Sequence, residues 1–315
     1  MENKNIAIGV DVGGTSIKGA AITRDGKVLD VFSLPIRKVG EQDQTMKELV
    51  DLINQYLKDH NLNKDNVLGI GLGVPGAIDV DAGIILSSNN LKWFDLHIRD
   101  IVSEGTGLPA KIMNDANAAT LGEARFGVGK KYKDFIMLTL GTGVGGGIVI
   151  DHKLYTGNKD KAAELGHNAI VVDGEQCSCG RRGCLEAYAS ATALIRDAKR
   201  MMDAHKDSLM WKDEKVDGAT AFKYAKLGDK YAQEVVDNYI KYLGEGLLNF
   251  FNAFRPEAVI LSGGISKEGE YLTSRLYKYC KDRQFGFRCT PPVEIVVSEL
   301  GYDAGKVGAA SMFFE

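Results

Sequence analysis

Short apolar runs that stop at glycine or polar turns recur along the chain and predict β-strands. The run from Ile6 to Val12 ends in Asp-Val-Gly-Gly-Thr and resumes as a second run from Ile17 to Ile22. This pattern predicts two strands joined by a tight turn. The other runs of this kind cover residues 28–34, 67–74, 110–113, 135–140, 146–150, 258–261 and 293–297.

Apolar residues at three- and four-residue spacing predict amphipathic helices between these strands. In residues 41–60, for example, Met46, Leu49, Ile53 and Leu57 would share one face. We expect Asp95 to cap a short helix that ends at Val102. The remaining predicted helices cover residues 116–125, 191–202, 220–227, 231–254 and 304–314. Strands that alternate with helices predict an α/β fold.

The strand–turn–strand unit occurs twice. Residues 135–150 hold a strand, the turn Gly141-Thr142-Gly143 and a return strand, in the layout of residues 6–22. This similarity predicts an internal duplication. The chain length of 315 residues predicts two domains.

Composition narrows the classes of protein that the chain can belong to. The content of hydrophobic residues is 44% and that of charged residues 26%, as in globular proteins. The net charge of −3 gives no basic field for nucleic acid, and no apolar run is long enough for a membrane span. The first residues lack the apolar core of a signal peptide. With an odd number of cysteines, five, we expect a reducing cytoplasm.

Residues 177–184, Cys-Ser-Cys-Gly-Arg-Arg-Gly-Cys, place Cys177, Cys179 and Cys184 within eight positions, and His167 lies ten residues upstream. Three cysteines and one histidine are a ligand set of closed tetrahedral zinc sites. The glycines allow the tight turns that aim three sulfurs at one ion. We predict a structural zinc ion that orders the nearby carboxylates Glu164 and Glu186. The alternative is three free cysteines in a surface loop.

Two glycine turns offer backbone N–H groups that can surround phosphate oxygens. The first contains Gly13, Gly14 and Thr15, and the second contains Gly141, Thr142 and Gly143. A third pair, Gly263-Gly264, follows a predicted buried strand and would suit a nucleoside that passes close to the backbone. Each turn alone could also be an ordinary β-turn. The sequence lacks the P-loop and Rossmann glycine patterns.

Two charged residues accompany the first glycine turn. Asp11 directly precedes it and suits a Mg²⁺ ion that keeps most of its waters. Lys18 would lie near a phosphate, or would face solvent from its strand.

Asn114-Asp115 lies between a predicted strand and a predicted helix. A carboxylate at the end of a strand in an α/β sheet could accept a proton from a substrate hydroxyl. Phosphoryl transfer to an alcohol needs such a base, together with positioning and charge neutralisation. The alternative is that Asp115 only caps the helix that follows.

These motifs, taken in order, resemble the ROK family of repressors and sugar kinases, and most closely its ATP-dependent glucokinases. The resemblance covers nearly the whole chain. It depends on residues 11–15, Val74-Pro75-Gly76, residues 114–118, residues 140–147, Glu164-Leu165-Gly166-His167, the cysteine loop with Glu186, and Ser262-Gly263-Gly264.

The resemblance implies an actin-like, ribonuclease-H-like fold of two domains with a cleft between them. We expect residues 1–113 with about 301–315 in the smaller domain, and residues 114–300 in the larger one. It implies that Asp115 is the general base on a sugar hydroxyl. The implied sugar contacts are Gly76, Asn114, Glu164, His167, Glu186 and, with less support, Asn89 or its neighbour Asn90.

The resemblance implies transfer of phosphate from MgATP to the C6 hydroxyl of an aldohexose, with glucose expected. Mannose, N-acetylglucosamine and N-acetylmannosamine are alternative acceptors, and polyphosphate is an alternative donor. Family repressors carry a DNA-binding domain ahead of the first strand, and only five residues precede Ile6 here. A regulator without turnover and an actin-like or chaperone-like ATPase are the alternatives of other classes. A homodimer or homotetramer is expected from the family.

Overall fold

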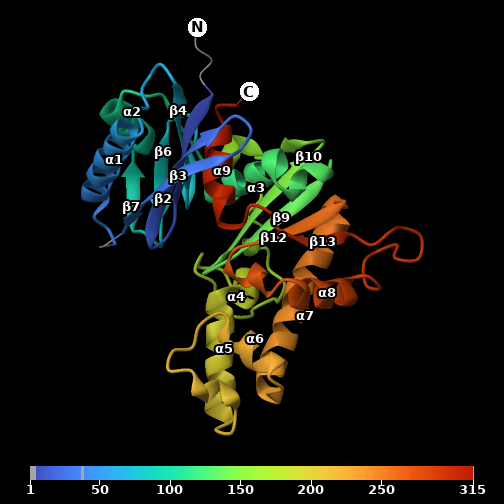
Figure 1. Cartoon of the computed structure of the whole chain (residues 1–315). Helices are drawn as coiled ribbons and strands as arrows, with labels where there is room; N and C mark the ends of the chain where they lie inside the picture. The colour runs from blue at the N-terminus through green and yellow to red at the C-terminus, as the bar shows by residue number, and fades with distance from the viewer. Residues whose placement is uncertain (1–4, 37–38, 315) are drawn as a thin grey trace. The chain divides into compact units, whose positions relative to one another are not determined.

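The computed structural model of the chain describes residues 5–36 and 39–314 (Figure 1). It contains two compact units. Unit 1 comprises Met1–Lys131, Ile148–Ala163 and Glu299–Glu315, and unit 2 comprises Tyr132–Gly147 and Glu164–Ser298. Residues 114–131, expected in the larger domain, group with unit 1 because helix α3 (Asp115–Phe126) packs against helix α9 (Ala304–Ser311). The expected division into two domains with a cleft remains a prediction.

The first sheet has the strand order β3-β2-β1-β4-β8. Strands β1 to β3 form an antiparallel meander, and β4 and β8 continue the sheet in parallel with β1. Each of these strands was predicted. Their bounds are β1 Ile6–Val12, β2 Ser16–Thr23, β3 Val28–Pro35, β4 Val67–Val74 and β8 Ala110–Asn114.

The second sheet repeats this plan in the order β11-β10-β9-β12-β13. In sequence order, both sheets read third, second, first, fourth and fifth strand. As in the first sheet, β12 and β13 run parallel to the leading strand, here β9. The shared order is what an internal duplication predicts. The bounds are β9 Phe135–Leu140, β10 Val144–Ile150, β11 Lys153–Leu154, β12 Ala258–Ser262 and β13 Glu294–Val297.

A small antiparallel sheet of β5 (Ala77–Asp79), β6 (Ile84–Ser88) and β7 (Trp93–Leu96) was not predicted. Asp95 lies within β7, so the prediction that it caps a helix is wrong. The chain stays extended because Trp93 and Leu96 are both buried. Helix α2 (Ile98–Thr106) begins only after His97.

Helix α9 packs directly on the first sheet through backbone contacts. A Cβ atom on Gly9 would lie 1.9 Å from the Lys306 carbonyl oxygen, and one on Gly71 would lie 1.9 Å from the Ala309 carbonyl oxygen. A Cβ on Gly308 would lie 1.6 Å from the Ala118 carbonyl oxygen of α3. The missing side chains therefore allow three backbones to meet in unit 1.

Glu123 connects three segments of unit 1 from within α3. Its side chain is fully buried. Oε2 accepts a hydrogen bond from the Val128 N–H at 3.0 Å, and Oε1 accepts one from the Leu300 N–H at 2.8 Å. A buried carboxylate is stable when backbone donors surround it in this way. Glu123 thus fixes both the end of α3 and the approach to α9.

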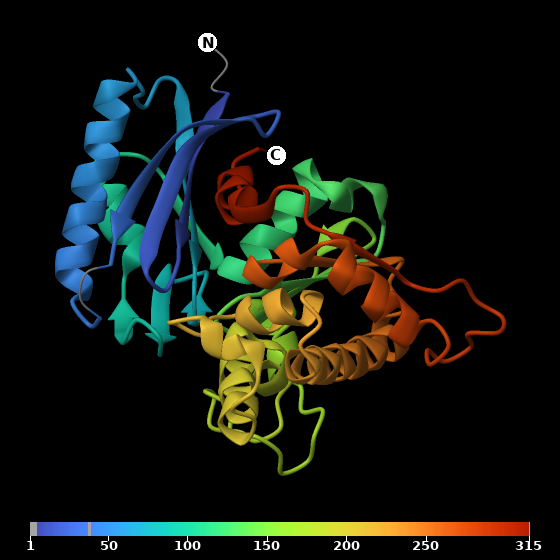
Figure 2. The same cartoon turned by 60° about the horizontal axis from the view of Figure 1, so that its bottom comes forward.

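The remaining helices cover unit 1 and build most of unit 2. In Figure 2, the long helix α7 lies beside α8, and the two are in contact. Helix α8 was not predicted. The bounds are α1 Gln42–Asp59, α4 Glu186–Ala189, α5 Ala191–Ala204, α6 Thr220–Lys226, α7 Lys230–Phe254 and α8 Glu270–Cys280. Short 3₁₀ turns cover Val128–Lys131, Asn158–Asp160, Leu165–His167, Leu209–Lys212, Gly264–Glu268 and Gly301–Asp303.

Candidate active site and metal centre

The parallel strands of the first sheet bring several of the predicted residues of unit 1 to one edge. In the strand register, Asp11 of β1 is opposite Gly73 of β4, and Val74 is opposite Asn114 of β8. A Cβ on Gly73 would lie 3.7 Å from the Asp115 Cα atom. The carboxyl ends of parallel strands are where α/β folds bind ligands.

Asn114, not Asp115, is the N-cap of α3. The Asn114 side-chain oxygen accepts hydrogen bonds from the Ala116 and Asn117 N–H groups, at 3.0 and 3.1 Å. Asp115 is the first residue of the helix and is half-buried, and its Oδ1 accepts the Ala116 N–H at 2.8 Å. The capping task therefore does not account for an aspartate at 115. The cap occupies the acceptor end of the Asn114 amide and does not use its NH₂ group.

The Asp11 carboxyl group is packed against the start of α9. A Cβ on Gly305 would lie 2.9 Å from the Asp11 Cγ atom. Burial raises the pKa of Asp11 above its ordinary value, and the positive charges of Lys306 and Lys18 offset part of this effect. Lys18 is exposed, with its Nζ 5.6 Å from the centre of the Tyr302 ring. A bound cation would favour the ionised form of Asp11.

The first glycine turn is open on its outer side. Gly14 and Thr15 are exposed, and a Cβ on Gly14 would meet nothing within 4 Å. The turn is closed by a hydrogen bond from the Gly13 N–H to the Ser16 carbonyl at 3.0 Å. Neither glycine has a positive φ. Their role is therefore to leave the backbone accessible, not to supply a left-handed conformation.

Gly76 has a structural reason to be glycine. Its φ is +102°, and a Cβ there would lie 2.2 Å from the Ser87 carbonyl oxygen of β6. Asn89 and Asn90 are exposed in the turn that follows β6. The structure thus brings Ser87 and Ser88, which directly precede Asn89, close to Gly76.

In unit 2, the second glycine turn lies beside the third glycine pair. A Cβ on Gly263, whose φ is +86°, would lie 2.5 Å from the Leu140 carbonyl oxygen. Gly264 begins the 3₁₀ turn that follows. The first residues of α5 bind the second glycine turn through two hydrogen bonds of 2.8 Å. The Ala191 N–H donates to the Gly141 carbonyl, and the Thr192 hydroxyl donates to the Thr142 carbonyl.

The structure brings His167, Cys177, Cys179 and Cys184 together, with their ligand atoms within 4.8 Å of one another. The sulfurs of Cys179 and Cys184 are 3.7 Å apart, and the Cys177 sulfur is 3.6 Å from His167 Nδ1. Tetrahedral zinc with Zn–S near 2.3 Å and Zn–N near 2.05 Å requires separations of about 3.8 and about 3.6 Å. The donor set and these two separations therefore fit a zinc ion.

The backbone of the cysteine loop confirms the predicted need for glycine. Gly180 and Gly183 have φ values of +90° and +80°. A Cβ on Gly183 would lie 1.6 Å from the Val171 carbonyl oxygen. The loop therefore turns at these glycines, as three converging sulfurs require.

Burial raises the pKa of two of the three thiols. It raises the pKa of Cys177 and raises that of Cys184 to about 12. For Cys179, burial acts in the same direction but is outweighed by a hydrogen bond with the Arg181 backbone and by the neighbouring thiols, so its pKa is lowered. Metal ligation uses thiolates, so binding of an ion would release protons.

The two predicted carboxylates flank the metal cluster in the sequence, since Glu164 precedes His167 and Glu186 follows Cys184. Glu186 begins α4, and its Oε2 accepts the Val144 N–H at 3.0 Å directly after the second glycine turn. Its Oε1 accepts the Ser178 hydroxyl at 2.7 Å. The sequence did not predict these two bonds. Burial of the carboxyl group raises the pKa of Glu164, while His167 lowers it and Glu186 raises it further.

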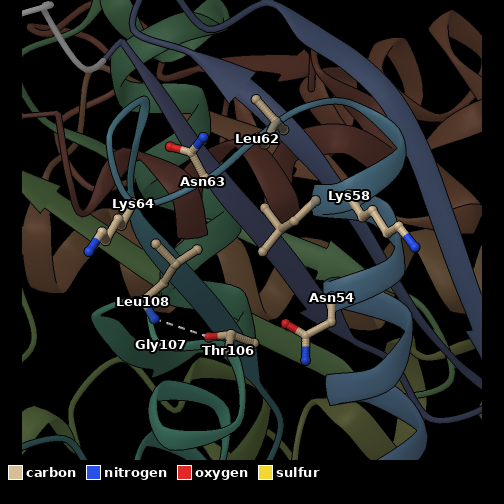
Figure 3. A pocket seen from close by; sticks show the side chains of 9 residues that line it. Asn54, Lys58, Leu62, Asn63, Lys64, Thr106, Gly107 and Leu108 are labelled. Carbon is tan, nitrogen blue, oxygen red and sulfur yellow. Dashed lines mark hydrogen bonds between the residues drawn. The ribbon is translucent and has the colours of Figure 1, made fainter.

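A surface pocket of unit 1 contains none of the predicted site residues. It lies between the ends of α1 and α2 (Figure 3) and is lined by Asn54, Leu57, Lys58, Leu62, Asn63, Lys64, Thr106, Gly107 and Leu108. The side chains of Lys58 and Lys64 point outward on opposite sides of the pocket. Because its charges do not converge, we do not assign it a ligand.

Comparisons with known proteins agree with the order of the motifs. The model of the ROK family matches residues 7–315. A glucokinase of Halalkalibacterium halodurans is 37% identical over 96% of this chain and 92% of its own length. A xylose repressor of Caldicellulosiruptor bescii is 35% identical over 90% of this chain and 72% of its own.

A solved structure has the same fold. The ROK family glucokinase of Streptomyces griseus, determined in complex with glucose and AMPPNP, is 34% identical. It covers 98% of both chains with a TM-score of 0.84. The predicted α/β, actin-like fold class is thereby confirmed.

Proposed function

The chain belongs to the ROK family, and from this membership we propose that it is an ATP-dependent hexose kinase that converts glucose to glucose 6-phosphate. One observation carries the proposal: the Streptomyces griseus glucokinase, solved with glucose and an ATP analogue, aligns over 98% of both chains. The transfer is from the γ-phosphate of ATP to the C6 hydroxyl.

Asp115 is the proposed general base. Its carboxylate takes the proton of the C6 hydroxyl while that oxygen forms a bond to the γ-phosphorus. The bond from the γ-phosphorus to the β,γ-bridging oxygen breaks, and ADP leaves with the electron pair. The support for this role is that Asn114, and not Asp115, caps α3, which leaves a half-buried carboxylate at a strand end.

The proposed sugar contacts are polar groups at a strand end, in turns and at the start of α4. They are Gly76, Asn89, Asn114, Glu164, His167 and Glu186. A hexose is a ring of donors and acceptors, so selective binding needs several fixed carboxylates and amides. His167 Nδ1 faces Cys177, which leaves Nε2 for a sugar hydroxyl.

The nucleotide is proposed to bind at the glycine turns. Gly13, Gly14, Thr15, Gly141, Thr142 and Gly143 would donate N–H and hydroxyl groups to the phosphates, and Gly263 and Gly264 would adjoin the nucleoside. Asp11 would hold Mg²⁺ through water, with Lys18 near a phosphate. The openness of Gly14 and Gly141, where an added Cβ meets nothing within 4 Å, supports access to these N–H groups.

A structural zinc ion bound by His167, Cys177, Cys179 and Cys184 is part of the proposal. The match between the observed separations and tetrahedral geometry supports zinc. When bound, the ion supplies no reaction chemistry and orders the loop between Glu164 and Glu186. The zinc site would use three of the five cysteines as reduced thiolates, which supports a reducing compartment such as the cytoplasm.

The test is a coupled assay of ADP formation with the purified chain. Glucose, mannose, N-acetylglucosamine and N-acetylmannosamine are compared as acceptors, and ATP is compared with polyphosphate as the donor. We expect glucose with ATP to give the highest kcat/KM. Absence of turnover with all four sugars would contradict the proposal, and ATP consumption without added sugar would favour an ATPase.

A second candidate function, a sugar-responsive regulator without turnover, is favoured by the similarity to xylose repressors. It predicts sugar binding that Asp115→Asn leaves intact and no ADP formation by the unmodified chain. The kinase predicts turnover that the same change abolishes. From family membership we propose a homodimer or a homotetramer, and light scattering of the purified protein measures its oligomeric state.

In the described part of the chain, no helix has the length and apolar character needed to span a membrane.

A further inference from the structure

The Glu186 carboxylate connects two segments of unit 2 that the proposed function uses. Its Oε2 accepts the Val144 N–H at 3.0 Å, directly after the second glycine turn, and its Oε1 accepts the Ser178 hydroxyl at 2.7 Å, from within the cysteine loop. A Cβ on Gly143 would lie 2.4 Å from the same Oε2. One side chain therefore links the turn proposed for phosphate to the loop proposed for the metal.

Two donors on different oxygens fix the plane of a carboxylate. Glu186 begins a helix of only four residues and is half-buried, so the helix itself does not hold its side chain. A free glutamate loses rotamer entropy when it binds a ligand. With Val144 and Ser178 in place, that cost is met before the sugar arrives, and the carboxylate keeps lone pairs for sugar hydroxyls.

Ser178 is the donor that this arrangement retains when a metal is bound. The Cys177 sulfur also lies 3.6 Å from Glu186 Oε1. A cysteine that ligates a metal does so as a thiolate and has no S–H to donate. The Ser178 hydroxyl, whose residue is no metal ligand, can donate to Oε1 in either state.

We propose that Ser178 is a positioning residue that orients the Glu186 carboxylate for the sugar while Val144 N–H holds its other oxygen. The inference rests on the proposed function, since it assumes that Glu186 binds the hexose. Ser178 does not contact the reacting atoms. It acts through Glu186, so its loss weakens sugar binding in the ground state and the transition state alike.

The experiment compares Ser178→Ala with Ser178→Thr, which keeps a hydroxyl group. Ser274→Ala is the matched control, because Ser274 is an exposed serine of unit 2 whose hydroxyl donates to the Glu270 carbonyl of its own helix. We measure the KM for glucose, the KM for ATP, kcat, zinc per chain, and the amide NMR signal of Val144. Glu186→Gln supplies the reference signal for a weakened bond to Val144.

For Ser178→Ala we expect the KM for glucose to rise about fivefold to tenfold, because the change removes one exposed hydrogen bond to a charged group. We expect kcat, the KM for ATP and the zinc content to stay within twofold. The Val144 signal should move part of the way toward its position in Glu186→Gln. Ser178→Thr and Ser274→Ala should match the unmodified chain.

An unchanged KM for glucose together with an unmoved Val144 signal would overturn the inference. Loss of zinc, or an equal rise in both KM values, would also overturn it, because Ser178 would then support the loop as a whole. If the unmodified chain neither phosphorylates nor binds any of the hexoses, the proposed function fails. In that case the Val144 signal alone decides whether Ser178 orients Glu186.

Discussion

Asn114 and Asp115 are chain neighbours with different tasks at the start of α3. The Asn114 side chain satisfies the first N–H groups of the helix, while Asp115 adds a half-buried carboxylate beside them. The sequence alone could not separate capping from catalysis, because either residue type caps helices well. Only the backbone conformation assigns the cap to 114.

Replacing Asp115 tests the proposed base. Asp115→Asn keeps the size of the side chain but removes its ability to take a proton. We expect kcat to fall by about two to four orders of magnitude, with glucose affinity retained within a few fold. Steady-state kinetics and equilibrium titration with glucose measure the two effects. A variant that keeps more than a tenth of the activity would exclude Asp115 as the base.

The ionised Asp11 carboxylate, which is proposed to hold Mg²⁺, lowers the stability of the folded chain. Its folded-state pKa lies above the ordinary value of 3.8, so the ionised form is less favourable in the folded chain than in the unfolded one. The resulting loss of stability is absent below the unfolded-state pKa and grows as the pH rises through the folded-state pKa. We therefore expect Asp11→Asn to raise the Tm at neutral pH and to lower kcat/KM.

The comparison of Tm values between pH 3.5 and pH 7 checks this expectation. The difference between Asp11→Asn and the unmodified chain should shrink toward the acid end of the range. Asp51→Asn, at an exposed position of α1, is the control and should not change the Tm. A variant with a lower Tm than the unmodified chain at pH 7 would show that the contacts of the ionised carboxylate outweigh its burial.

At the scale of elements, patterning predicted most helices and every strand of the two large sheets except the two-residue β11. The small β5–β7 sheet was missed because its strands are short and only partly apolar. A signal for α8 was present, since Leu272, Leu276 and Cys280 recur every four residues and are all buried. The spacing rule that found α1 would have found it too.

The metal loop shows how far local sequence determines a site. Three cysteines within eight residues predicted the ligand set, and the structure brings His167 to them. The hydrogen bond between Glu186 and Val144 joins residues 42 positions apart. No local pattern specifies such a bond, because it depends on how the second sheet packs against the loop.

Removal of the metal should loosen the segment from Glu164 to Glu186. We expect about one zinc per chain, and chelation should lower the Tm and the glucose affinity together. Cys184→Ser should have the same two effects because it removes a buried ligand. Cys289→Ser is the control, since Cys289 is exposed and outside the cluster. Full activity in protein that elemental analysis shows to be free of metal would refute the prediction.

At the scale of the whole molecule, the chain builds two sheets of equal strand order. The chain passes from one unit to the other after Lys131, Gly147, Ala163 and Ser298. Glu123 accepts hydrogen bonds from the N–H groups of Val128 and Leu300. These two residues lie within three positions of the crossings after Lys131 and Ser298, so Glu123 fixes the backbone of unit 1 beside both. The sequence could predict the duplication from its two glycine turns, but not this role of a glutamate within a helix.

Glu123→Ala should therefore destabilise unit 1. The change leaves two N–H groups without the buried carboxylate that accepts them, at an expected cost of about 2–5 kcal/mol in the free energy of unfolding. Urea denaturation measures this value. Glu104→Ala, at an exposed glutamate of α2, should change it by less than about 0.5 kcal/mol. A similar result for both variants would mean that water replaces the carboxylate at little cost.

The place of α9 on the first sheet has a consequence for synthesis. The strands that Gly9 and Gly71 belong to leave the ribosome early, and the helix whose backbone lies on those glycines leaves much later. Until α9 has been made, a nascent chain has nothing of its own to cover that face of the sheet. Release of α9 from the ribosome should therefore let the first-made strands of unit 1 complete their packing.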